Sequence, residues 1–134
     1  RRFFSRSTDG GKTWSHPQPA ALPAAVTCQA GLTSLSAKEG WADLVLISRI
    51  SNVERRYDME VLLSRDGGVT FPVRMSLPAG DVMPGYSDLC VIAEEEPIVG
   101  LLHCRCNHVL FSRISLQTLS GGAYESTTRN AWLF

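Results

Sequence analysis

Short extended runs, separated by Gly, Pro, Asp and Asn, form the dominant pattern along this chain. Runs of this kind are typical of β-strands joined by turns. No segment sustains an apolar stripe at i, i+3, i+4 and i+7 for more than about three turns, so a long amphipathic helix is not expected. We predict an all-β chain with strands at Arg2–Ser7, Thr33–Ser36, Ala42–Ile50, Asp58–Ser64, Val73–Leu77, Ser87–Ala93, Ile98–His103 and His108–Ser115.

One octet occurs twice in the chain. Residues 7–14 read STDGGKTW, and residues 64–71 read SRDGGVTF, an offset of 57 residues. Five of the eight positions are identical, and the last position is aromatic in both copies. The offset suits one propeller blade of four strands with a long loop, because blades of about 40–50 residues are typical.

Each position of the octet has a physical role in a tight hairpin. Asp-Gly-Gly tolerates positive φ, and the Asp carboxylate and Ser hydroxyl can accept hydrogen bonds from N–H groups of the turn. The aromatic residue is expected to start the next strand and to pack inward. The octet is the Asp-box, S-x-D-x-G-x-x-W/F, and two copies favour a β-propeller. We predict a structural role, away from catalytic residues, for Ser7, Asp9, Gly11, Trp14, Ser64, Asp66, Gly68 and Phe71.

The charge balance and the lengths of the apolar runs argue against some classes of function. The 134 residues include 13 Lys and Arg against 13 Asp and Glu. This balance gives no basic footprint for nucleic acid and no polybasic patch for a membrane surface. The apolar runs are shorter than the ~18 residues needed to span a bilayer, so no transmembrane segment is predicted. The chain begins at Arg1, and residues 1–4 read as the inside of a strand, so we expect an upstream continuation or a processed product.

Cysteine spacing argues against a metal site. The pairs of ligands at CxxC spacing that a zinc site requires do not occur in the sequence. A cluster of Cys104 and Cys106 with His103 or His108 has the wrong spacing, so we predict no metal. We interpret the thiols as buried or half-buried, which mildly favours a reducing compartment, at Cys28, Cys90, Cys104 and Cys106.

Two segments around the second octet resemble the exo-α-sialidase family, in particular the animal lysosomal and cytosolic enzymes. In that family an Arg lies eight residues before the Ser of the last Asp-box, in R-x-N/D-L/M, and Arg56 stands there, followed by Asp58 and Met59. The family's tyrosine lies in G/A-Y-S-S/D-L, and Tyr86 matches it 30 residues after Arg56. Without these motifs, Tyr86 would be interpreted as a core tyrosine and Arg56 as a solvated surface residue.

The resemblance also extends upstream and covers residues 2–119. Cys28-Gln29 is similar to a Cys-Gln pair whose Gln meets the substrate in the cytosolic-type enzymes. The resemblance implies that residues 1–119 form C-terminal blades of a six-bladed propeller, incomplete in this chain, and it leaves residues 120–134 as an unassigned tail. The motifs do not select one cellular compartment. Residues 56–59, which read RYDM, favour the lysosomal type, whereas residues 86–89, which read YSDL, favour the cytosolic type.

The activity implied by the resemblance is hydrolysis of terminal sialic acids from glycoproteins, glycolipids and oligosaccharides. Tyr86 would be the nucleophile of a retaining mechanism, and Arg56 would clamp the sialate carboxylate through charge-assisted hydrogen bonds. Gln29 would be a further substrate contact. The mechanism needs no metal and no organic cofactor.

Several of the family's catalytic residues do not occur in this chain. These are the Arg of the F/Y-R-I-P motif, the acid/base Asp, the activating Glu and the second Arg of the triad, which all belong upstream of Arg1. We therefore expect the fragment alone to be inactive, with too few blades to close a ring. The alternatives are a non-catalytic Asp-box propeller that binds glycans or proteins, a truncated product that does not fold alone, and a trans-sialidase.

Overall fold

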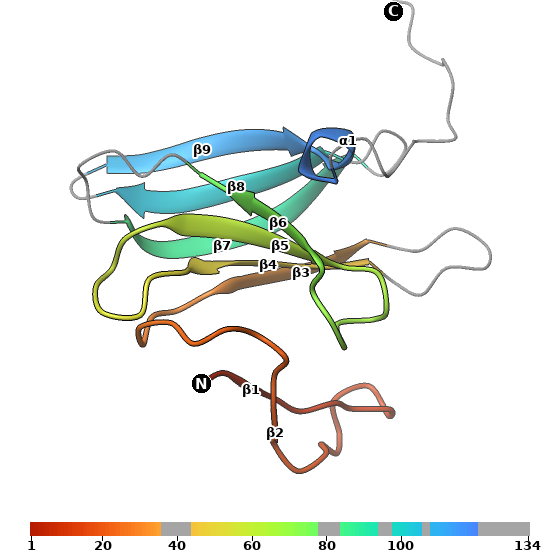
Figure 1. Cartoon of the computed structure of the whole chain (residues 1–134). Helices are drawn as coiled ribbons and strands as arrows, with labels where there is room; N and C mark the ends of the chain where they lie inside the picture. The colour runs from red at the N-terminus through yellow and green to blue at the C-terminus, as the bar shows by residue number, and fades with distance from the viewer. Residues whose placement is uncertain (36–43, 78–83, 94–97, 106–107, 121–134) are drawn as a thin grey trace, which may run out of the picture.

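The computed structural model describes residues 1–35, 44–77, 84–93, 98–105 and 108–120, and its regular structure is almost entirely β (Figure 1). This confirms the predicted fold class. Cys106 and residues 121–134 of the tail lie outside the described residues. The elements are β1 (Phe3–Phe4), β2 (Gln18–Pro19), β3 (Gly31–Leu35), β4 (Leu44–Ile50), β5 (Met59–Ser64), β6 (Val73–Ser76), β7 (Pro84–Ala93), β8 (Ile98–Arg105), β9 (His108–Ser115) and α1 (Leu116–Leu119).

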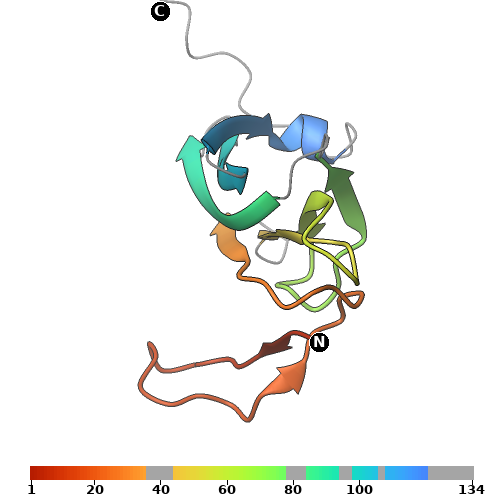
Figure 2. The same ribbon diagram turned by 90° about the vertical axis from the view of Figure 1, so that its left-hand side faces the viewer.

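The strands form three antiparallel sheets that follow one another in chain order. Their strand orders are β1-β2, β3-β4-β5-β6 and β7-β8-β9, so within each sheet every strand pairs with the next strand in sequence. Figures 1 and 2 show the second and third sheets facing each other, with the β1-β2 hairpin to one side of them. The four-stranded meander is the arrangement expected of one propeller blade.

One apolar core joins the second and third sheets. Alternate residues of β4, β5 and β8 point into it, and every residue of β5 is buried. The short helix α1 closes one end of the core with two leucines, and the side-chain hydroxyl of Ser115 caps this helix by accepting from the Thr118 N–H (3.1 Å). The core consists of Leu35, Leu44, Leu46, Val61, Leu63, Leu89, Val99, Leu101, Ile114, Leu116 and Leu119.

The two sheets approach each other closely at Gly31. A Cβ atom at this position would lie 2.6 Å from Ser48 Oγ, 2.7 Å from Asp88 Cα and 2.9 Å from the Leu89 nitrogen. Two of these three atoms belong to the backbone of β7 and cannot rotate away. Any side chain at this position would therefore push β3 and β7 apart.

Both octets form the same hydrogen-bonded turn. In the first, the Ser7 hydroxyl donates to Asp9 Oδ1 (2.8 Å) and accepts from the Gly11 N–H (2.8 Å). The Asp9 carboxylate also accepts from the N–H of Thr13 (2.9 Å) and from its hydroxyl (2.6 Å). The second octet repeats these contacts with Ser64, Asp66, Gly68 and Thr70.

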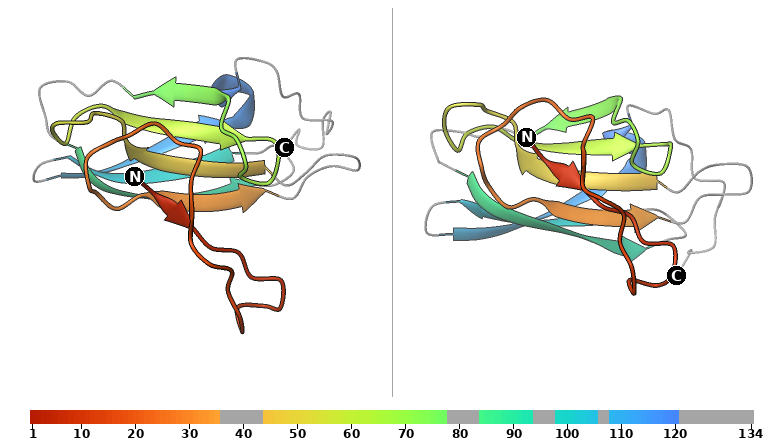
Figure 3. Two further views of the ribbon diagram at one scale, coloured as in Figure 1. Left: turned by 60° about the horizontal axis from the view of Figure 1, so that its bottom comes forward. Right: turned by 90° about the horizontal axis from the view of Figure 1, so that it is seen from below.

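A side chain just before the first octet contacts the second Asp-box turn. The guanidinium of Arg6 donates from Nη2 to the carbonyl oxygen of Gly67 (3.0 Å), which links the N-terminal hairpin to that turn. Figure 3 shows the first hairpin extending beyond the sheets. Gly67 has φ +69° and Gly68 φ +83°, so the second turn uses the left-handed region that glycine adopts without strain.

Hydrogen bonding lowers the pKa of both box carboxyl groups. Asp9 has a pKa of about 2, mainly because the Thr13 hydroxyl and then the Thr13 N–H donate to its ionised form, and Asp66 is lowered further by the same pattern from Thr70. Unfolding restores an ordinary Asp pKa of ~3.9. The stability that these bonds supply is therefore complete above about pH 4 and is lost as pH falls toward the folded pKa.

Some sequence-based predictions were wrong near the N-terminus. The strand predicted over residues 2–7 is limited to β1, and β2 was not predicted. Trp14 does not start a strand or pack inward: its side chain is 64% exposed, and its indole N–H donates to the Gly11 carbonyl (3.1 Å). The reason is that β1 pairs only with β2 among the described residues, so no sheet face covers the indole.

Two further predictions need correction. Phe71 is half-buried but lies two residues before β6, so it does not begin that strand. Cys28 and Cys104 are half-buried, as predicted, whereas Cys90 is exposed. Cys90 follows the buried Leu89 in β7, and successive residues of a strand point to opposite faces.

We expect Thr13→Val to raise the pKa of Asp9 from about 2 toward the ordinary value, because the Thr13 hydroxyl makes the largest contribution to the lowering. NMR titration of the Asp9 carboxyl carbon measures this pKa directly. Thr8→Val, at an exposed position in the same turn, is the matched control and should leave the pKa unchanged. Equal pKa values in both variants would contradict the role given to Thr13.

We expect Gly31→Ala to lower the free energy of unfolding by about 1–3 kcal/mol, because the added methyl group overpacks the contact with β7. Urea denaturation measures the effect. Gly85→Ala is the control, since its Cβ would lie 3.4 Å from the nearest atom, Cys104 Cβ, where small adjustments suffice. The interpretation fails if the two substitutions are equally destabilising.

Candidate functional site

The structure brings Tyr86, Arg56 and Gln29 to the same end of the sheets. Tyr86 lies near the start of β7, Arg56 in the loop between β4 and β5, and Gln29 two residues before β3. The guanidinium carbon of Arg56 is 5.6 Å from the centroid of the Tyr86 ring, which is a cation–π distance. Tyr86 is 56% exposed, so it is not a core tyrosine.

A hollow of about 200 Å³ opens beside the Tyr86 ring. Leu102 and the polar side chain of Asp88 contribute to its wall. Asp88 lies two residues after Tyr86 in β7 and therefore on the same face of the sheet. Sequence reasoning missed Asp88, although the alternation in Y-S-D would have placed it beside Tyr86. The hollow is lined by Gln29, Tyr86, Ser87, Asp88, Leu102, His103 and Cys104.

The loop that carries Arg56, residues 51–58, is closed by its own polar groups. The N–H and the hydroxyl of Ser51 both donate to the Asp58 carbonyl oxygen (2.8 and 2.9 Å). Asn52 Oδ1 accepts from the N–H groups of Glu54 (2.9 Å) and Arg55 (3.1 Å), as in an Asx turn. Asp58 has φ +60°, a left-handed conformation that Asp tolerates better than most residues. The Ser51–Asp58 hydrogen bonds therefore join the two ends of the loop, and the Asn52 side chain stabilises its interior.

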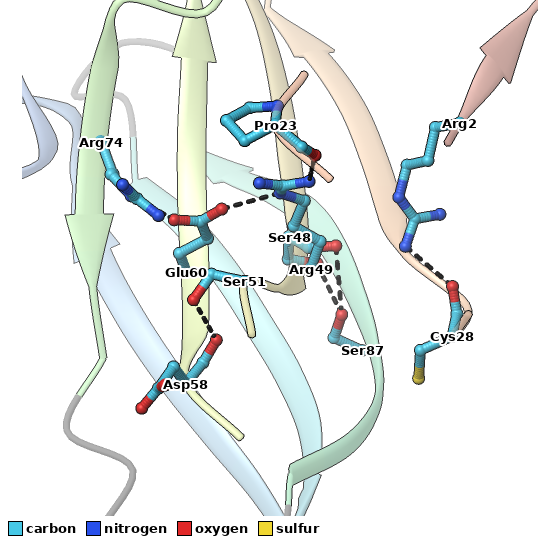
Figure 4. Close-up of polar contacts among 10 residues, drawn as sticks. All are labelled: Arg2, Pro23, Cys28, Ser48, Arg49, Ser51, Asp58, Glu60, Arg74 and Ser87. Atoms are coloured by element: carbon cyan, nitrogen blue, oxygen red, sulfur yellow. Dashed lines mark hydrogen bonds and ion pairs between the residues drawn. The ribbon is translucent and has the colours of Figure 1, made fainter. Parts of the chain in front are cut away.

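A buried ion pair lies at the base of this loop. Arg49 in β4 and Glu60 in β5 are paired in register, are both almost fully buried, and contact each other through Nε and Oε1 (2.7 Å). Figure 4 shows the second guanidinium, from Arg74, approaching the other oxygen of Glu60. Arg49 also donates from Nη1 to the Pro23 carbonyl oxygen (2.7 Å). The pair thus fixes the β4-β5 hairpin and ties it to the segment that leads to Gln29.

That segment is anchored from the N-terminal hairpin as well. Arg2 donates from Nη2 to the Cys28 carbonyl oxygen (2.8 Å; Figure 4). Burial, and then the positive charge of nearby Arg49, lower the pKa of Arg2 from its ordinary value. The backbone N–H of Val26 donates to the Asn52 carbonyl oxygen (2.9 Å), which joins the segment to the loop of Arg56.

This arrangement places an exposed guanidinium, which can bind an anion, beside an exposed phenol. An exposed guanidinium offers paired N–H donors to a carboxylate, and the adjoining phenol can attack once a base removes its proton. Among the described residues, no group of three or more His, Cys, Asp or Glu side chains could hold a metal ion. No helix in the same part of the chain is long and apolar enough to cross a membrane.

Comparisons with known proteins agree with the propeller-type architecture. The family described as "BNR repeat-like domain" matches residues 1–104. A curated relative named "Sialidase", from Bacteroides fragilis (strain YCH46), is 33% identical over 125 residues, which cover 88% of this chain and 22% of the relative. The chain therefore spans about a fifth of the length of that relative. No solved structure matches the chain significantly.

We expect Glu60→Gln to lower the free energy of unfolding by about 3–5 kcal/mol, because it leaves the buried guanidinium of Arg49 without its counter-charge. Urea denaturation of the variant and the parent chain gives this difference. Glu54→Gln, at an exposed position of the adjoining loop, is the control and should change the free energy by less than about 0.5 kcal/mol. Similar losses for both variants would rule out the buried pair as the cause.

Proposed function

The chain belongs to the family of BNR repeat-like domains and is related to a bacterial sialidase, and from this premise we propose that it is part of a retaining exo-α-sialidase. Its substrates would be sialylated glycoproteins, glycolipids or oligosaccharides. Tyr86 would be the nucleophile and Arg56 a ligand of the substrate carboxylate. The narrower assignment to the animal lysosomal or cytosolic type stays a prediction, since the relative found is bacterial.

The proposal is carried by the position of the Arg56 guanidinium over the Tyr86 ring. Sialic acid bears its carboxylate on the anomeric carbon, so a nucleophile for that carbon and a cation for that carboxylate must lie side by side. Arg56, in the loop between β4 and β5, and Tyr86, in β7, are 30 positions apart in sequence, and their contact supports this arrangement. The exposure of Tyr86 leaves the phenol accessible to a substrate.

The residue types suit the reaction. A carboxylate nucleophile would be repelled by the carboxylate of the sugar, whereas a neutral phenol is not. The Tyr86 oxygen would form a bond to the anomeric carbon and lose its proton to a base, while the bond to the leaving-group oxygen breaks and an acid protonates that oxygen. Water would then attack the anomeric carbon, release Tyr86 and give the sugar with retained configuration.

The base and the acid of this mechanism would come from outside the chain. We propose that the fragment alone is inactive and that a longer protein supplies these groups, consistent with the chain's share of its relative's length. Tests of turnover therefore use the longer protein that contains this chain.

We expect Tyr86→Phe in that protein to lower kcat on a sialoside by about a thousandfold or more, because it removes the attacking oxygen. Steady-state hydrolysis of an aryl sialoside measures this. Tyr57→Phe, on the half-buried neighbour of Arg56, is the matched control and should stay within about twofold of the parent.

Two outcomes would contradict the proposal. Turnover that survives in Tyr86→Phe would exclude Tyr86 as the nucleophile. A parent protein that binds sialosides and does not hydrolyse them would indicate a non-catalytic Asp-box module.

A further inference from the structure

The pairing of β7 with β8 is interrupted where β7 carries Tyr86. Pro84 is paired with Arg105 and Ser87 with His103, and a register shift lies between these two pairs. A shift of this kind leaves part of the strand without its usual ladder partners and often re-aims a side chain near a site. The conformation at Tyr86 must therefore be fixed by other contacts.

The segment of residues 28–31 supplies such contacts on both sides of Tyr86. The Cys28 thiol donates to the carbonyl oxygen of Gly85 (3.5 Å), the residue before Tyr86. The backbone N–H of Ser87, the residue after Tyr86, donates to Gln29 Oε1 (3.0 Å). Two adjacent side chains thus hold the two backbone groups that flank the phenol-bearing residue.

Ser87 is also held from the opposite direction. Its hydroxyl lies 2.9 Å from the Ser48 hydroxyl, and both residues are buried (Figure 4). Gly31 permits this approach, because a Cβ atom there would lie 2.6 Å from Ser48 Oγ. The part of β7 that contains Tyr86 is consequently fixed against both β4 and the segment before β3.

The amide of Gln29 is engaged within the protein. Its Oε1 accepts from Ser87, and its Nε2 donates to the carbonyl oxygen of Ala30 (3.0 Å). A substrate contact would compete with these bonds. We propose that Gln29, with Cys28, is a positioning residue that sets the backbone of Tyr86, in place of the substrate contact expected from sequence. The catalytic consequence of this inference rests on the proposed function.

The experiment uses Gln29→Met in the longer protein that contains this chain, because Met keeps the side-chain length and removes the acceptor. Hydrogen exchange of the Ser87 N–H should become about tenfold faster or more. In sialoside hydrolysis, kcat should fall about ten- to a hundredfold, while KM stays within about twofold, because a small displacement of the nucleophile slows the chemical step. Gln18→Met, exposed on β2, is the matched control and should change neither quantity.

The possible outcomes separate the inference from the proposed function. A raised KM with unchanged kcat would identify Gln29 as a substrate contact and overturn the inference. Unchanged Ser87 exchange in Gln29→Met would overturn it as well. If the parent protein hydrolyses no sialoside, the proposed function fails, yet the exchange measurement still decides whether Gln29 holds β7. Should Gln29→Met not fold, Gln29→Asn, which shortens the side chain out of reach of Ser87, serves for both measurements.

Discussion

The close approach of Gly31 to β7 is the constraint on which the rest of the molecule depends. With no side chain at this position, β3 lies against the backbone of Asp88 and Leu89. Because the sheets touch here, the apolar side chains beyond this point share one core, and the Ser48 and Ser87 hydroxyls meet. A wider separation would leave the hydroxyl pair buried without partners, which is costly in a low-dielectric interior.

A buried ion pair lies on the opposite face of β4 and β5 from this core. Glu60 contacts two guanidinium groups. That of Arg49 is buried with it, and that of Arg74 extends to it from an exposed position on β6. A hydrophobic pair of the same volume would often be at least as stable, so stability alone does not explain the ion pair. The directional hydrogen bonds from Arg49 to Glu60 and to Pro23 instead fix the relative position of three chain segments.

Much of the fold could be predicted from sequence, because strand patterns and Asp-box turns are local signals. The strand at His108–Ser115 coincides with β9, and the octets placed both turns. The exposed position of Trp14 could not be predicted, since it depends on which sheet covers the ring. The motifs selected Tyr86 and Arg56 for a shared site, yet the bond from Ser87 to Gln29 spans 58 residues and follows only from the packing of sheets.

The second Asp-box turn and the site lie at opposite ends of the same strand. β5 begins at Met59, next to the loop of Arg56, and ends at Ser64, where the second box starts. Because the box carboxyl groups stay ionised far below neutral pH, these hairpins keep their hydrogen bonds unchanged from neutral solution to the acidity of a digestive compartment. Acid responsiveness in a protein built on this chain would then have to originate outside these two turns.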